Sequence, residues 1–114
     1  MRLTILNKRK KRNDRNHIIY KLVSRSTGKE YIGMTEKKGQ KVIGSVKIRW
    51  KQHLSRAKRG YPLKLYDAIR ELGEEDFDLV VVEVVRGRRE TFARESQIIN
   101  DLLPELNTKI KSSI

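Results

Sequence analysis

The chain of 114 residues contains no cysteine, which excludes disulfide scaffolds, thiolate metal centres and cysteine nucleophiles. Two histidines are too few for a zinc site built from several histidines. No apolar run reaches 18 residues, and no apolar stretch follows the basic N-terminus, so neither a transmembrane helix nor a secretory signal is expected. These absences favour an intracellular protein without a membrane partner.

Acidic residues are scarce in the first half of the chain. Residues 1–60 contain 19 Lys and Arg against 3 Asp and Glu, whereas residues 61–114 contain 8 against 11. The whole chain has a formal net charge of +13. This asymmetry indicates a polyanionic partner, with nucleic acid as the leading candidate. The basic stretch 8–12 is not part of an amphipathic helix, which disfavours a membrane surface and leaves a solvated arm as the alternative.

The length of the chain is that of one domain. We expect a basic arm at 1–16, a folded domain at 17–110 and a short tail at 111–114. The expected order of elements is β-β-α-α-β-α. It predicts an α+β, sandwich-like fold with a small three-stranded, mainly antiparallel sheet flanked by helices.

Hydrophobic periodicity and turn residues give the boundaries of the expected elements. Ser45 is the expected N-cap of the first helix, and Pro62 and Gly73 bracket the second. Pro104 ends the third helix. The expected strands cover residues 17–23, 30–35 and 77–85, and the expected helices cover 46–59, 62–72 and 89–103.

The first two strands are predicted to form a hairpin. If the connection between them has an even number of residues, Tyr20 pairs with Gly33 and Leu22 pairs with Tyr31. The two tyrosines then share one face, and the glycine leaves space beside Tyr20. A connection with an odd number of residues would place the tyrosines on opposite faces, and the sequence does not choose between the two.

Two helices carry polar residues at informative positions. Arg49 and His53 lie one helical turn apart, and Arg56 extends their face, although a solvated basic face would explain this arrangement too. Glu95 is expected at the buried edge of the third helix, where a lone carboxylate needs an arginine or a metal ion as partner. The expected buried stripe of that helix comprises Phe92, Ser96, Ile99 and Leu103.

Taken together, these motifs resemble those of the GIY-YIG nuclease family. Its first motif corresponds to Ile18-Ile19-Tyr20, where isoleucine replaces the family's glycine, and its second motif is intact as Tyr31-Ile32-Gly33. The family also has an arginine with a histidine one turn later, a glutamate on a later helix and an asparagine after that helix. These correspond to Arg49, His53, Glu95 and Asn107.

The resemblance implies a DNA endonuclease, similar to the catalytic domain of homing endonucleases, in a bacterium or a phage-infected host. The sequence shows no long DNA-recognition region after the matched motifs, so we expect either an excised catalytic domain or a stand-alone nuclease. The implied cofactor is one Mg²⁺ or Mn²⁺ ion held by Glu95. A site for two metal ions would need several clustered carboxylates, and the matched motifs do not supply them.

The identity of the general base stays open at this point. The resemblance suggests Tyr20, with Tyr31 contacting water or phosphate, although only about 0.3% of a free tyrosine is phenolate near pH 7.5. His53 has the more suitable intrinsic pKa, and it could act as the base itself or relay the proton from Tyr20. Arg49 is expected to hold a phosphate oxygen, and Asn107 to orient a neighbouring group.

Basic residues outside these motifs are expected to bind the DNA backbone, whether the protein acts as a monomer or as a dimer formed on DNA. The alternative function is a basic nucleic-acid-binding module without catalysis, which explains the charge but not the alignment of six polar residues with the family. The expected DNA-binding residues are Lys8, Arg9, Lys10, Lys11, Arg12, Lys37, Lys38, Lys41 and Arg56.

Overall fold

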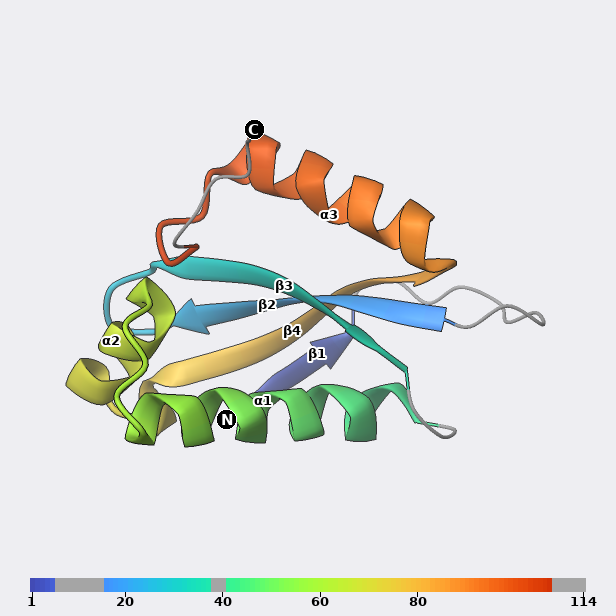
Figure 1. The fold of residues 1–114 in the computed structure, drawn as a ribbon. Helices are drawn as coiled ribbons and strands as arrows, with labels where there is room; N and C mark the ends of the chain where they lie inside the picture. Colours follow the sequence, from blue (N-terminus) through green and yellow to red (C-terminus); the bar gives the residue numbers. More distant parts are fainter. Residues whose placement is uncertain (6–15, 38–40, 108–114) are drawn as a thin grey trace.

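The computed structural model describes residues 1–5, 16–37 and 41–107, which form a sheet covered by helices on both faces (Figure 1). The helix α1 lies on one face of the sheet and α3 on the other, while α2 packs near one end. The strands are β1 (Leu3–Ile5), β2 (Asn16–Ser24), β3 (Glu30–Glu36) and β4 (Phe77–Arg86). The helices are α1 (Val42–Lys58), α2 (Lys64–Leu72) and α3 (Arg88–Leu102), with a 3₁₀ turn over Glu74–Asp76.

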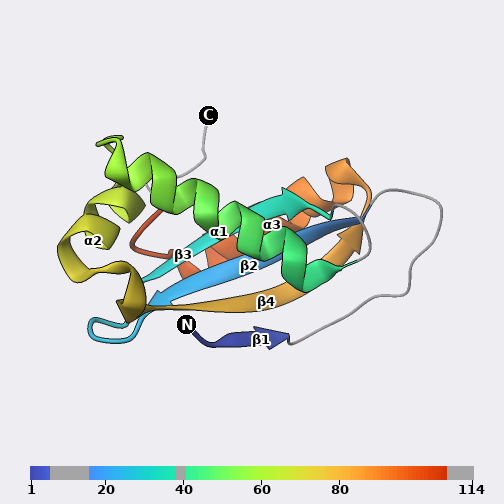
Figure 2. The same cartoon turned by 90° about the horizontal axis from the view of Figure 1, so that it is seen from below.

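The α+β class and the order of the elements from residue 16 onward are confirmed, but the expectation of three strands is wrong. The described sheet has four strands in the order β1-β4-β2-β3, and it is mixed because β1 runs parallel to β4 (Figure 2). The additional strand covers three residues of the predicted arm. Its pairing with Leu79–Val81 depends on a contact distant in sequence, which a three-residue pattern cannot reveal.

Each face of the sheet carries its own hydrophobic core. Ile18, Tyr20 and Leu22 point toward α1 and α2, whereas Ile19 and Ile32 point toward α3. This alternation follows from the two-residue period of a strand. The pairing of β2 with β4 changes register between Ile19 and Tyr20, so Val81 and Val84 of β4 face the same core although they are three residues apart.

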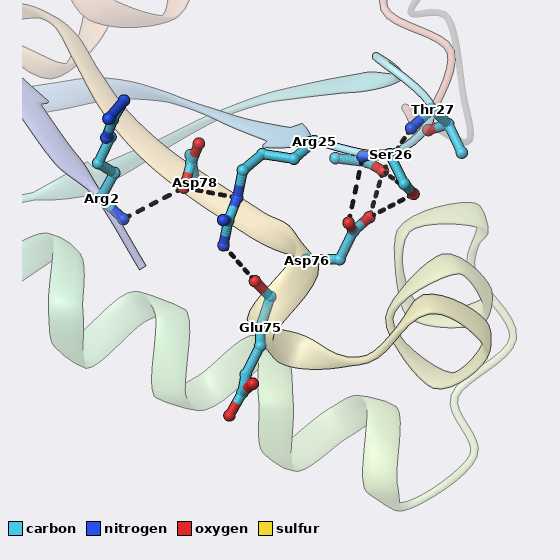
Figure 3. Close-up of polar contacts among 8 residues, drawn as sticks. Arg2, Arg25, Ser26, Thr27, Glu75, Asp76 and Asp78 are labelled. Atoms are coloured by element: carbon cyan, nitrogen blue, oxygen red, sulfur yellow. Dashed lines mark hydrogen bonds and ion pairs between the residues drawn. The ribbon is translucent and has the colours of Figure 1, made fainter.

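Two acidic residues around the start of β4, Asp76 and Asp78, bind the turn of the β2–β3 hairpin (Figure 3). Asp76 accepts hydrogen bonds from the hydroxyls of Ser24 and Ser26, at 2.5 and 2.9 Å, and from the Ser26 amide at 3.1 Å. Asp78 forms an ion pair with Arg25 and accepts a hydrogen bond from the amide of Arg2. These contacts join the hairpin, β4 and the N-terminus, so this acidic stretch has a structural role.

Two predicted helix starts differ from the structure. The helix α1 begins at Val42, so Ser45 lies in its first turn, where its hydroxyl donates to the carbonyl of Lys41 at 3.0 Å. The burial of Val42 against the core extends the helix beyond the predicted cap. Pro62 precedes the N-cap Leu63 of α2, while Gly73 ends that helix as predicted.

The predicted buried stripe of α3 is also partly wrong. Ile99 is buried, but Phe92 is 57% exposed and Leu103 is 67% exposed, and the buried positions are Thr91, Ile98 and Ile99. The helix is therefore rotated from the orientation that hydrophobic spacing predicted. No helix in the described part of the chain has both the length and the apolar character that a bilayer span requires.

Candidate active site

The hairpin register places the two motif tyrosines together. Tyr20 pairs with Gly33 and Leu22 pairs with Tyr31, as the even-connection prediction required. Tyr20 and Tyr31 share the face toward α1, and their ring centroids are 6.3 Å apart. The two strand motifs therefore meet because neighbouring strands align them, although eleven positions separate the tyrosines in the sequence.

Gly33 allows the close approach of these rings. A Cβ atom built on Gly33 would lie 2.6 Å from the Tyr20 hydroxyl oxygen and 2.9 Å from Cε2 of Tyr31. Both distances are far below van der Waals contact, so any side chain here would displace a tyrosine. The glycine of the second motif is therefore a steric requirement of the site.

We expect Gly33→Ala to lower any activity that depends on Tyr20 by about 100-fold, because a displacement of about 1 Å at a reacting group has that effect. The fold should persist, since β3 is an edge strand. The backbone hydrogen bonds between β3 and β2 do not use the space beside Gly33 that the new methyl group would fill. Single-turnover rates measure the first effect, and circular dichroism with thermal unfolding measures the second. Gly44→Ala is the matched control, because a Cβ there meets nothing closer than 3.8 Å.

A buried chain of hydrogen bonds links Tyr20 to the helices. The Tyr20 hydroxyl lies 2.7 Å from Nε2 of His53, and Nδ1 of His53 lies 3.0 Å from the Tyr66 hydroxyl. All three side chains are at most 3% exposed. His53 projects from α1 and Tyr66 from α2, so the packing of these two helices against the sheet completes the chain.

Burial determines the protonation states of Tyr20 and His53. Burial raises the pKa of Tyr20 above its ordinary value, as does the neighbouring Tyr31, while the charge of Arg49 and its hydrogen bond oppose the rise without cancelling it. Burial together with the charges of Arg49 and Arg56 lowers the pKa of His53 to about 3. Near neutral pH the histidine is therefore an uncharged imidazole and the tyrosine a neutral phenol.

Arg49 lies between the buried, hydrogen-bonded side chains and the surface. It is half-buried on α1, it hydrogen-bonds Tyr20, and its Nη1 donates to Oε1 of Gln52 at 3.0 Å. Its Nε is buried and has no hydrogen-bond partner. A half-buried guanidinium that lines a pocket is well suited to an anionic oxygen.

Glu95 shares a pocket with Arg49, although the two come from opposite faces of the sheet. The strand β3 is at the edge of the sheet, so a pocket of about 830 Å³ can extend around it from α1 to α3. Its wall includes Thr35 of β3, and Glu95 also contributes to raising the pKa of Tyr31, for which burial is the main cause. The carboxylate therefore lies near both Arg49 and Tyr31.

The carboxylates at this pocket fit a hard cation better than a soft one. Glu95 and Glu36 both line the pocket and offer oxygen donors, which Mg²⁺ and Mn²⁺ prefer. Within residues 1–5, 16–37 and 41–107, no three His, Asp or Glu side chains are grouped closely enough to hold a metal ion. A cation that keeps several waters matches this sparse donor set.

Asn107 binds the backbone of Ile32, the middle residue of the second motif. Its Oδ1 accepts from the amide of Ile32 and its Nδ2 donates to the carbonyl of Ile32, both at 2.9 Å. The amide of Leu106 also donates to the carbonyl of Glu30 at 2.9 Å. The segment after α3 therefore covers the open edge of β3 and holds the backbone next to Tyr31 and Gly33.

The described residues among the predicted DNA contacts lie at both ends of α1. Lys41 is exposed at its N-cap and Lys37 follows β3, whereas Arg56 is in its last turn and lines a smaller pocket together with Arg49 and Gln52. These positions are next to the candidate site. The remaining predicted DNA contacts, Lys8, Arg9, Lys10, Lys11, Arg12 and Lys38, lie outside the described residues.

Sequence reasoning missed two residues of the site. Tyr66 was not singled out, because its role depends on how α2 packs against α1. His17 lines the large pocket, is 7% exposed, and its Nδ1 has no hydrogen-bond partner. Its pairing with Glu36 in the hairpin register was the signal that could have indicated its position.

One comparison with known proteins gives a match over the folded part of the chain. A model of the GIY-YIG catalytic domain matches residues 16–109, which is most of the chain. No curated protein and no solved structure matches the chain. The matched range contains every side chain of the buried hydrogen-bond chain, together with Arg49, Glu95 and Asn107.

Proposed function

Because the chain belongs to the GIY-YIG nuclease family, we propose that it is a DNA endonuclease that hydrolyses phosphodiester bonds with one divalent cation. The observation that carries this proposal is the buried Tyr20–His53 pair beside Arg49, at the border of the pocket that Glu95 lines. A base, a cation for the phosphate and a carboxylate are the groups that phosphodiester hydrolysis requires. The net charge of +13 supports a polyanionic substrate.

Tyr20 is the general base in this proposal, and His53 accepts its proton. The raised pKa of Tyr20 means that the phenol keeps its proton until a water molecule attacks. The Tyr20 hydroxyl then takes a proton from that water and passes its own proton to Nε2 of His53, 2.7 Å away. His53 is unprotonated beforehand, so the lone pair of Nε2 is free for this proton. Because burial and the neighbouring positive charges make the imidazole a weak base, the transfer is concerted with the attack of the water on the phosphate.

Tyr66 gives His53 the tautomer that this transfer needs. When Nδ1–H of His53 donates to the Tyr66 hydroxyl, 3.0 Å away, the lone pair of Nε2 faces Tyr20. Tyr66 is thus a positioning residue. Tyr20 is 1% exposed, so the attacking water enters from the side of the partly exposed Tyr31 and Arg49.

Arg49 stabilises the phosphate in this proposal. Its guanidinium lines the pocket and can donate to a non-bridging oxygen as negative charge develops there. Glu95 would hold the divalent cation, which when bound supplies positive charge beside the phosphate. Asn107 keeps Tyr31 and Gly33 in place through Ile32.

The test is the nicking of supercoiled plasmid with Mg²⁺, with Mn²⁺ and with EDTA, comparing the wild type with Glu95→Gln. We expect the wild type to nick only with a divalent cation, and the variant to be slower by at least 100-fold because it loses the charged ligand. The carboxylate of Glu83 already pairs with Arg94 at 2.8 Å, so Glu83→Gln is the control on the same side of the sheet. Titration with Mn²⁺ followed by calorimetry should show weaker binding only for Glu95→Gln.

Nicking in EDTA by the wild type, or full activity of Glu95→Gln, would contradict the role of the cation. A wild type that binds DNA but leaves plasmid and a randomised DNA library intact would favour the alternative, a nucleic-acid-binding module without catalysis. Analytical ultracentrifugation with and without a short duplex decides between a monomer and a dimer formed on DNA.

A further inference from the structure

Phe92 is exposed at a position where hydrophobic spacing predicted burial. It lies in the second turn of α3, and its side chain is 57% exposed. Exposing a phenyl ring to water costs free energy that burial would recover. Its neighbour Thr91 takes the buried position instead, with its hydroxyl donating to the carbonyl of Gly87 at 2.6 Å.

The exposed ring lines the same pocket as Arg49 and Glu95. Figure 1 shows that α3 starts at the end of the sheet where β2 begins and β3 ends. Phe92 and Glu95 are three residues apart on α3 and therefore neighbours on the helix surface. The aromatic surface is thus adjacent to the carboxylate proposed to act in catalysis.

The chemistry of the pocket favours a nucleotide over an apolar protein segment as the partner of this ring. His17, Glu36 and Arg88 line the pocket together with Arg49 and Glu95, so the ring stands among charged and polar groups. A hydrophobic peptide would have to remove water from those groups without replacing their hydrogen bonds. A nucleotide carries an anionic phosphate for the guanidinium and a flat apolar face for the ring.

We propose that Phe92 is a stacking platform for an unpaired base next to the scissile phosphate, so that the preferred substrate is DNA with an unstacked nucleotide. The inference rests on the proposed function, because it places the phosphate beside Arg49 and Glu95. In an intact duplex the faces of each base are covered by its neighbours, so a ring outside the duplex can stack only on a base that has left the stack. Bulges, flaps and single strands present such bases.

The experiment tests whether the Phe92 ring strengthens binding only when the DNA strand carries bases. The probes are a labelled dT12 oligonucleotide and a 12-residue abasic strand with the same phosphates, titrated in EDTA and followed by fluorescence anisotropy. We expect Phe92→Leu to bind dT12 about tenfold more weakly than the wild type and to bind the abasic strand equally well, because only base stacking is lost. Phe92→Trp should bind dT12 at least as tightly as the wild type.

Two controls separate stacking from general effects. Leu102→Ala removes another exposed apolar side chain of α3, 51% exposed and distant from the pocket lining, and should bind both probes as the wild type does. In Phe92→Trp, the fluorescence of the new indole should be quenched by dT12 and not by the abasic strand. The native Trp50 is 9% exposed, so the wild type provides the background.

Equal losses of Phe92→Leu on both probes, or no loss on either, would overturn the stacking role. The proposed function fails separately, if the wild type never cleaves DNA with a divalent cation. When the wild type does cleave, a duplex with one bulged nucleotide should be cut at least tenfold faster than the fully paired duplex, and Phe92→Leu should reduce that preference. Equal cleavage of both duplexes by the wild type would overturn the substrate preference.

Discussion

Tyr20→Phe should lower the rate of DNA cleavage by about two to four orders of magnitude, the range that general base catalysis contributes. The substitution removes only the hydroxyl that faces Nε2 of His53, and the ring remains in the core beside Tyr31. DNA affinity should therefore stay nearly unchanged. The variant leaves the His53 nitrogen without its partner, which destabilises the fold by about 1–3 kcal/mol. Single-turnover cleavage, DNA titration and thermal unfolding measure the three effects.

Tyr66→Phe is the matched comparison, since it removes the hydroxyl at the other nitrogen of His53. We expect a loss of only about tenfold, because Tyr66 fixes the tautomer and does not contact the water. ¹⁵N NMR of His53 should show one predominant tautomer in the wild type and a mixture in Tyr66→Phe. Near-wild-type cleavage by Tyr20→Phe would transfer the role of the base to His53.

The low pKa of His53 provides an independent check on this mechanism. Since that pKa is about 3, the imidazole should remain neutral from pH 5 to pH 8, and its ¹⁵N shifts should not titrate in that interval. The activity should then show no acid limb near pH 6.5 caused by this residue. A His53 that titrates near 6.5 would mean that the chain of hydrogen bonds is open to water.

Arg49→Ala should lower the cleavage rate by about 100- to 1000-fold, because it removes the guanidinium that the proposed function places beside the phosphate. Arg49→Lys should recover only part of this loss, since an ammonium lacks the forked donors of a guanidinium. The charge of Arg49 also lowers the pKa of His53, so the pKa of His53 should be higher in Arg49→Ala. Cleavage rates and histidine NMR give two separate readouts.

Arg56→Ala is the control for Arg49, on the same helix and beside a smaller pocket. If Arg56 contacts only the DNA backbone, its loss should weaken binding uniformly and reduce the salt dependence of binding by about one unit of slope. The rate of cleavage at saturating DNA should remain unchanged. Equal effects of the two substitutions on that rate would contradict a special role for Arg49.

Local patterns were sufficient to predict most of the fold. The β-branched and aromatic residues of 17–23 and 30–35, with the turn between them, predicted the hairpin, and Gly73 and Pro104 marked helix ends, because these preferences act over a few residues. The same reasoning failed for the edge strand Leu3–Ile5, whose partner lies more than 70 residues away. It also placed Phe92 in the core, because hydrophobicity alone does not distinguish a buried ring from an exposed one.

The sequence by itself determined which chemical groups this protein brings to its site: two tyrosines on neighbouring strands, an arginine and a histidine one turn apart, and a glutamate and an asparagine later in the chain. Only the tertiary structure decided their states and their neighbours. The packing of α1 and α2 buries His53 between Tyr20 and Tyr66 and so keeps it neutral, since desolvation disfavours its charged form. The edge position of β3 lets Arg49 and Glu95 line one pocket from opposite faces of the sheet, because no further strand of the described sheet lies beyond β3.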